Sequence, residues 1–255
     1  MPVIADTCPR GDPFGSRPGA ADSLNIVRKN VGVLARTPLF AGVSAGDCAR
    51  AVAVARVQAF SRGDMLYVDE DPVRDVFLLT EGLVKVMKIG VTGTVAILGL
   101  RMPGDVLGAV SLLCAARHST TAAPLRLCRA LVWRASEFNV LVENSPRLYR
   151  NVLRIQNGYL LEIEERFRDI ATEMVGPRVA RQLLRLTEKL GGPSSGSVEL
   201  TLSREEVAQM TGANLYSISR LLAEWEDRGI VRSRREAVTI CDLQALGVIA
   251  KVSNK

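Results

Sequence analysis

The end of the chain constrains its fold most strongly, because two short helical segments there are separated by a glycine. Ser203 and Glu206 have the spacing of a capping box and predict a helix that runs to about Thr211. Gly212 predicts the turn, and Asn214 is an acceptable N-cap for a second helix. Two consecutive helices joined by so tight a turn predict a helix-turn-helix unit.

The second helix is predicted to have one buried and one exposed face. Its apolar residues recur three or four positions apart: Ile218, Leu221, Leu222 and Trp225. The opposite face presents Tyr216, Ser219 and Arg220, with Ser217 at its edge. Short polar groups, an aromatic ring and an arginine at the start of such a helix are typical of contacts to base edges and phosphates in a major groove.

A basic hairpin is predicted beyond Gly229. Ile230–Ser233 and Ala237–Cys241 predict two strands around Arg234-Arg235-Glu236, which would form a wing whose arginines face the DNA backbone. This combination predicts a C-terminal winged helix-turn-helix that binds double-stranded promoter DNA. The DNA contacts that we expect come from Ser203, Arg204, Asn214, Tyr216, Ser217, Ser219, Arg220 and Arg234.

The first part of the chain has three successive sequence patterns: a proline- and glycine-rich arm, helical segments and short β-type runs. Residues 1–22 are rich in proline and glycine and predict a disordered arm, after which a helix is expected from Ser23 and another from a capping box at Ser44 and Asp47. Short β-type runs punctuated by glycine then predict an antiparallel barrel or sandwich: Val76–Leu79, Leu83–Met87, Val95–Leu100 and Leu125–Val132.

A long helix is predicted after the strands. Its apolar stripe is flanked by charged residues, as in a coiled-coil seam, and comprises Leu148, Val152, Ile155, Tyr159, Ile163, Phe167, Ile170 and Met174. Gly176-Pro177 is the predicted break and hinge. The expected domains are therefore an arm (1–22), a β-rich barrel domain with flanking helices (23–140), a long dimerisation helix (141–176) and a DNA-binding domain (177–255).

Composition narrows the possible functions. The formal net charge of +6 over 255 residues permits a polyanionic partner. The longest charge-free apolar runs, Ile89–Leu100 and Val106–Ala116, are too short to span a bilayer, so we expect a cytoplasmic protein without a membrane partner. The five cysteines are scattered without a C-x-x-C motif, which predicts no disulfide framework and no metal site. Common catalytic motifs are absent, so no enzyme is expected.

The order of these motifs resembles the cAMP receptor protein / fumarate–nitrate regulator (Crp/Fnr) superfamily of transcription regulators. The resemblance rests on Pro38-Leu39-Phe40, Tyr67, Phe77-Leu78-Leu79, Glu81-Gly82, Val84-Lys85-Val86, Pro103-Gly104-Asp105-Val106-Leu107-Gly108, Thr201–Ala208, Thr211-Gly212, Ser217–Leu222 and Trp225–Ile230. It implies an α+β fold: an N-terminal β-roll (jelly-roll barrel) of the cyclic-nucleotide-binding type, a long dimerisation helix and a C-terminal winged helix-turn-helix. It also implies a homodimer on a two-fold symmetric site and RNA polymerase as a partner.

The resemblance places Arg220 on the family's base-reading and phosphate-contacting arginine, and Ser219 on a residue that often approaches bases. Tyr216 replaces the glutamate common at its position, and Leu215 replaces an arginine of the cAMP-receptor branch. The operator sequence therefore cannot be transferred from the family.

The same resemblance disfavours cyclic AMP as the effector. Ala109 follows Gly108 where cyclic-AMP binders have a glutamate, and His118-Ser119 aligns with their arginine–serine pair, with Arg117 one residue earlier. Ile163 and Glu164 stand where those proteins place hydroxyl groups against the adenine. The expected effector pocket comprises Gly108, Ala109, Arg117, His118, Ser119, Thr120, Ile163 and Glu164.

Other kinds of sensor require particular residues to bind a cofactor or react with an oxidant. An iron–sulfur cluster needs several cysteines near the N-terminus, where Cys8 stands alone, so none is expected. Haem is a less favoured alternative that would use His118, the single histidine, and a redox signal would act at Cys114 or Cys128. A cyclic-nucleotide-type module that acts through protein–protein contacts is the alternative from another class, and the effector itself is unknown.

Overall fold

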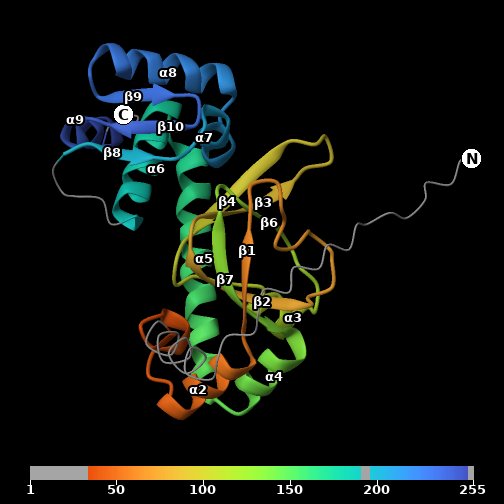
Figure 1. Ribbon diagram of the computed structural model, residues 1–255. Helices are drawn as coiled ribbons and strands as arrows, with labels where there is room; N and C mark the ends of the chain where they lie inside the picture. Colours follow the sequence, from red (N-terminus) through yellow and green to blue (C-terminus); the bar gives the residue numbers. More distant parts are fainter. Residues whose placement is uncertain (1–33, 191–195, 252–255) are drawn as a thin grey trace, which may run out of the picture.

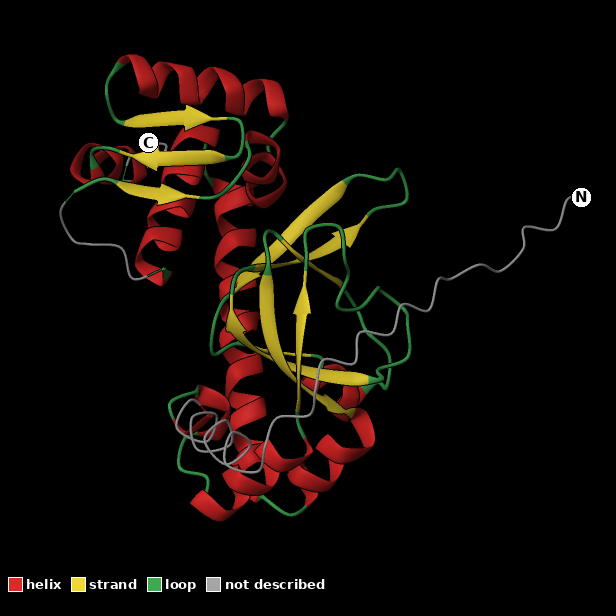
Figure 2. Ribbon diagram, viewed as in Figure 1, coloured by secondary structure: helices red, strands yellow, loops and turns green. Residues whose placement is uncertain are grey.

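The structure is a computed structural model that describes residues 34–190 and 196–251. A β-roll with flanking helices, a long helix and a winged helix-turn-helix follow one another along the chain (Figures 1 and 2). The predicted arm (1–22) and most of the predicted helix from Ser23 lie outside the described residues. This architecture confirms the predicted α+β fold.

The β-roll consists of two antiparallel sheets. One has the order β1-β7-β2-β5 and the other β4-β3-β6. Phe60, Phe77 and Val84 are among the buried residues that fill the space between the sheets. The strands are β1 (Arg56–Phe60), β2 (Asp75–Glu81), β3 (Val84–Ile89), β4 (Val95–Arg101), β5 (Val106–Leu107), β6 (Thr121–Pro124) and β7 (Cys128–Arg134).

The predicted run Leu125–Val132 is wrong as a single strand. β6 ends at Pro124 and β7 begins at Cys128, so the first three residues of the run form a turn that packs closely on Gly82. Gly82 has φ +86°, and a Cβ there would lie 2.5 Å from the carbonyl oxygen of Leu127. The run holds neither glycine nor proline, so no turn residue inside it marks where a strand begins, which explains the error.

Helices close one end of the β-roll. They are η1 (Pro38–Phe40), α2 (Ala45–Val54), α3 (Ala109–Cys114) and α4 (Ala135–Glu143). The capping interaction predicted for α2 is present, because Ser44 Oγ accepts a hydrogen bond of 3.1 Å from the Asp47 amide. Trp133 is fully buried, and its Nε1 donates to the Ala51 carbonyl at 2.7 Å. α2 is thereby fixed against β7.

The long helix α5 (Pro146–Thr172) runs alongside the β-roll and leads into α6 (Val175–Lys189) (Figure 1). The predicted break at Gly176-Pro177 is wrong by three residues, because the helices separate at Glu173-Met174. Pro177 lies in the first turn of α6, where the N–H that proline lacks would have no helical partner. In a continuous helix its ring would clash with the carbonyl four residues earlier, so the break has to precede it by a turn.

The C-terminal domain confirms the predicted winged helix-turn-helix. Its elements are β8 (Val198–Leu200), α7 (Arg204–Thr211), α8 (Leu215–Asp227), β9 (Val231–Arg234), β10 (Ala237–Ile240) and α9 (Leu243–Ala250), and its sheet order is β8-β10-β9. The first strand of the wing, β9, begins and ends one residue later than the predicted Ile230–Ser233. α9 was not predicted; Asp242 Oδ1 accepts from the amides of Gln244 and Ala245 in its first turn, and Leu246 is fully buried.

The DNA-binding domain packs on the β-roll of its own chain. Leu83, Met87 and Ile97 belong to the same buried apolar cluster as the core of that domain. Lys85 Nζ also lies 3.3 Å from the Glu206 carboxylate at the start of α7. Within the two described ranges, no helix is both long enough and apolar enough to cross a membrane.

Candidate nucleic-acid interface, hinge and effector pocket

The helix-turn-helix is held by its own local hydrogen bonds. Ser203 Oγ accepts from the Glu206 amide at 3.2 Å while Glu206 Oε2 accepts from the Ser203 amide at 3.0 Å, which completes the predicted capping box. Gly212 has φ +61°, a conformation that favours glycine. Asn214 Oδ1 then accepts from the Ser217 amide at 2.7 Å and starts α8.

α8 has the predicted two faces. Ile218, Leu222 and Trp225 are buried, whereas Tyr216 is 75% exposed and Arg220 is exposed. The helix lies on the outer side of its domain, away from the β-roll (Figure 1). Its exposed face is therefore free to approach a macromolecule.

The predicted DNA contacts fall into two groups. Asn214, Tyr216, Arg220 and Arg234 are exposed, and the half-buried group comprises Ser203, Arg204, Ser217 and Ser219. The side chains of Ser203 and Asn214 already serve as helix caps, and Arg204 Nε donates to Ser233 Oγ at 3.0 Å.

The wing is tied to the β-roll by an ion pair. Its two-residue turn, Arg235-Glu236, places Glu236 Oε1 2.6 Å from Nη1 of Arg62 in the loop after β1. Both side chains are more than half exposed, so the pair contributes little to stability. This contact was not predictable from the sequence, because the two residues are 174 positions apart in the chain.

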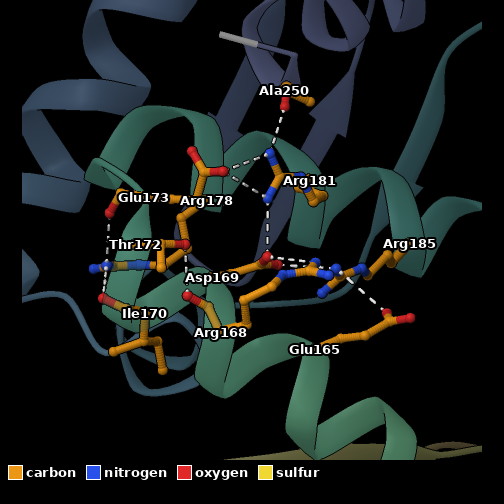
Figure 3. Close-up of polar contacts among 10 residues, drawn as sticks. All are labelled: Glu165, Arg168, Asp169, Ile170, Thr172, Glu173, Arg178, Arg181, Arg185 and Ala250. Carbon is orange, nitrogen blue, oxygen red and sulfur yellow. Dashed lines mark hydrogen bonds and ion pairs between the residues drawn. The ribbon is translucent and has the colours of Figure 1, made fainter. Parts of the chain in front are cut away.

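A cluster of arginines around Asp169 spans the break between α5 and α6 (Figure 3). Asp169 is 2% exposed, and its oxygens lie 2.9 Å from the guanidinium groups of Arg168, Arg181 and Arg185. Burial alone would raise the pKa of Asp169, but the hydrogen bond from Arg168 and the charges of Arg185 and Arg181 lower it below its ordinary value. The cluster holds α6 against the end of α5.

Arg178 links this break to the helix-turn-helix. Its Nη1 donates to the carbonyls of Ile170 and Glu173, both at 3.3 Å, and its Nη2 donates to the Gly212 carbonyl at 3.5 Å (Figure 3 shows the first two). It thus supplies hydrogen bonds to carbonyls at the end of α5 that have no helical partner. Burial lowers the pKa of Arg178, and Asp169 partly offsets that effect.

A cavity of about 410 Å³ lies between the β-roll and α5. Five residues of the predicted effector pocket line it: Gly108, Ala109, Ser119, Thr120 and Ile163. Its size is that of a site for a small organic molecule.

The other three predicted pocket residues do not line this cavity. Arg117 is exposed and its Nη1 donates to the Glu70 carbonyl at 2.6 Å, and Glu164 is exposed on α5. His118 is buried and stacks on Tyr67, with 3.8 Å between ring centroids. Burial lowers the pKa of His118, and the Asp71 carboxylate opposes that shift.

Several lining residues were missed by the sequence analysis. Tyr67, Lys88, Arg101, Gln156 and Tyr159 come from four different elements or loops. Arg101 is 4% exposed and its guanidinium lies 3.6 Å from the centroid of the Tyr159 ring. The sequence held one signal for this site, because Arg101 is a single arginine directly after the apolar run Val95–Leu100.

Among the described residues, no group of three or more histidine, cysteine, aspartate or glutamate residues could hold a metal ion. The described cysteines are free: Cys48 and Cys128 are buried, and Cys114 and Cys241 are exposed. Cys8 lies outside the described residues.

α5 carries two apolar stripes, not the single one predicted. Leu148 and Val152 are buried in the core of their own domain, and Ile155 and Tyr159 line the cavity. An exposed stripe, which we call the α5 seam, has heptad spacing and comprises Leu153, Leu160, Ile163, Phe167, Ile170 and, in the break directly after α5, Met174. Ile163 also lines the cavity. The single stripe predicted from the sequence combined residues of both faces and did not include Leu153 and Leu160.

Two family models match the chain and together cover more than half of it. Residues 57–145 match the cyclic nucleotide-binding domain, and residues 177–249 match the Crp-like helix-turn-helix domain.

Relatives with assigned functions are similar over most of their length. The CRP-like cAMP-activated global transcriptional regulator of Mycobacterium tuberculosis is 26% identical over 216 residues, which is 84% of this chain and 96% of that protein. The transcriptional regulator LdrP of Thermus thermophilus is 28% identical over 192 residues, 74% of this chain and 94% of LdrP. The structure of FixK2 from Bradyrhizobium japonicum shares the fold, with a TM-score of 0.69 and 21% identity over 79% of this chain and all of that one.

Proposed function

Because the chain belongs to the Crp/Fnr superfamily of transcription regulators, we propose that it acts as a homodimer that binds promoter DNA through α8 of each subunit. The observation that carries this proposal is the two-faced α8, with Tyr216 and Arg220 exposed on one side and Ile218, Leu222 and Trp225 buried on the other. Arg220 contacts bases and phosphates, and Arg234 on the wing contacts the backbone. RNA polymerase is the partner that such a regulator acts on.

The α5 seam supports the homodimer. Leu153, Leu160, Phe167 and Met174 are seven residues apart and are each between 46% and 70% exposed. An apolar stripe of this period pairs with a second helix in a coiled coil. A parallel pair of α5 helices places two recognition helices on one side of the dimer, which matches a two-fold symmetric operator.

The cavity between the β-roll and α5 supports a small-molecule effector other than cyclic AMP. Ala109 lines it where cyclic-AMP binders supply a carboxylate, and His118 is stacked on Tyr67 outside it. A ligand there contacts Ile163 on α5, so it can change how two α5 helices pair. Titration of the dimer with cyclic AMP in a calorimeter is expected to give no binding heat.

DNA binding is tested by selecting sites from a random DNA pool and measuring the affinity of the enriched site. The selected sequence is expected to be two-fold symmetric. Arg220→Ala should weaken binding to it by about tenfold or more, since one bidentate contact contributes about 1–3 kcal/mol. The matched control is Arg129→Ala, an exposed arginine on β7 of the β-roll. Equal affinity of both variants and the wild type would contradict the assignment of α8.

A further inference from the structure

The lining of the effector cavity carries an unbalanced positive charge. It contains two cationic side chains, Lys88 and Arg101, and no carboxylate. Lys88 is already paired, because its Nζ lies 2.7 Å from Asp69 Oδ2 and donates to the Ser119 carbonyl at 3.0 Å. Arg101 is therefore the cation in the lining whose charge has to be balanced by other groups.

The negative charge nearest to Arg101 is shared among three cations. Among the described residues, Glu162 supplies the carboxylate within 4 Å of Arg101, at 3.4 Å. The same carboxylate lies 3.5 Å from Arg166 and 3.2 Å from Lys189. One carboxylate that is 29% exposed thus faces three cations, two of which are almost fully buried.

Arg166 shows that this shortage is real. It is 8% exposed, and its Nη2 has no hydrogen-bond partner within the described ranges. Burial lowers the pKa of Arg166, Glu162 partly opposes that shift, and the charges of Arg101 and Arg185 lower it further. Buried cations without a matching anion are unfavourable, and a bound anion would relieve them.

We propose that the cavity binds a small organic anion whose charged group pairs with Arg101 and whose apolar, planar body lies against Tyr159 and Ile155. The geometry supports both halves of this ligand. The Arg101 guanidinium lines the cavity and stacks on the Tyr159 ring, and apolar side chains such as Ile155 and Leu98 cover much of the remaining wall. This proposal rests on the proposed effector cavity, but it does not depend on DNA binding.

The test uses two fluorescent probes with the same aromatic skeleton, titrated into the full chain. 1-Anilinonaphthalene-8-sulfonate is an anion, and N-phenyl-1-naphthylamine is its neutral analogue. Arg101→Gln is expected to weaken the anion by about tenfold or more, as for the loss of a charged hydrogen bond, and to leave the neutral probe within about twofold. Arg101→Lys keeps the charge and should retain most of the anion affinity.

Two further variants keep the test decisive if Arg101→Gln does not fold. Glu162→Gln removes the carboxylate that competes for Arg101, so it should strengthen the anion and not the neutral probe. Arg129→Gln, on the exposed face of β7, should change neither. Equal losses of both probes in Arg101→Gln, or unchanged anion binding in both Arg101→Gln and Glu162→Gln, would overturn the anion site. Such a result would leave the DNA-binding function untouched, because that function is measured separately with the selected DNA site.

Discussion

Oδ2 of Asp169, near the end of α5, lies 2.9 Å from Nη2 of Arg185 on α6. The two helices are separated by the break at Glu173-Met174, so this contact joins the β-roll half of the chain to the winged helix-turn-helix half. We expect Asp169→Asn to lower the free energy of unfolding by about 2 kcal/mol, because a buried acceptor of charged hydrogen bonds is lost.

Urea unfolding of the DNA-binding domain would measure this change through the fluorescence of Trp225, in a background where Trp133 is replaced by phenylalanine. The matched control is Glu165→Gln, whose carboxylate is 56% exposed and lies 3.5 Å from Arg185. It should change stability by less than about 0.5 kcal/mol. A loss in Asp169→Asn no larger than that of the control would show that the cluster does not hold the two helices together.

The single histidine provides a clean pH prediction. Burial lowers the pKa of His118 in the folded state, so the unfolded chain takes up a proton first as the pH falls below its ordinary value of about 6.5. The contribution of His118 to stability is therefore fully present above that value and is lost as the pH falls toward the folded pKa. The loss at about pH 5.5 is at most about 1.4 kcal/mol, the limit for one histidine that stays neutral in the folded state.

The comparison is between the wild type and His118→Phe, which keeps a ring against Tyr67. Unfolding by urea at about pH 7.5 and about pH 5.5 should show a smaller pH dependence in the variant. If both proteins lose the same stability over this range, groups other than His118 are responsible.

Adjacent leucines on α5 test the dimer. Leu160 lies on the α5 seam and Leu161 does not, yet they are 49% and 52% exposed. We expect Leu160→Glu to shift the chain toward the monomer in sedimentation, because it places two like charges against each other in an apolar seam. Leu161→Glu should leave the dimer intact. Identical behaviour of the two variants would rule out the seam as the interface.

The wing should contribute affinity without sequence preference. Arg234→Gln is expected to weaken binding to the selected site and to an unrelated duplex by a similar factor, and to reduce the slope of log affinity against log salt by about one. Fluorescence anisotropy at several salt concentrations would measure it. A loss confined to the selected site would instead make Arg234 a base-reading residue.

The helix-turn-helix was predictable because its signals are local. Ser203, Gly212 and Asn214 each act within three or four residues, so the boundaries of α7 and α8 follow from spacing alone. The faces of α8 follow from its period, since one side of that helix is buried and the other is exposed.

The cavity and the hinge were harder to predict because their contacts join distant residues. Arg101 and Lys189 both reach Glu162 only after the β-roll, α5 and α6 are assembled, and no periodicity encodes that meeting. The prediction of one apolar stripe on α5 was wrong for a related reason. It is covered by its own domain on one side and presents the seam on another, so its apolar residues follow two overlapping repeats.

The α5 seam also determines how promoter occupancy depends on the concentration of the protein. A stripe that is satisfied only by an identical stripe makes the DNA-binding species scale with the second power of the monomer concentration while monomers predominate. Below the dissociation constant of the pair, halving the copy number would then reduce promoter occupancy about fourfold. A fall in concentration alone, as when a cell grows without making more of the protein, would lower promoter occupancy more steeply than the concentration itself.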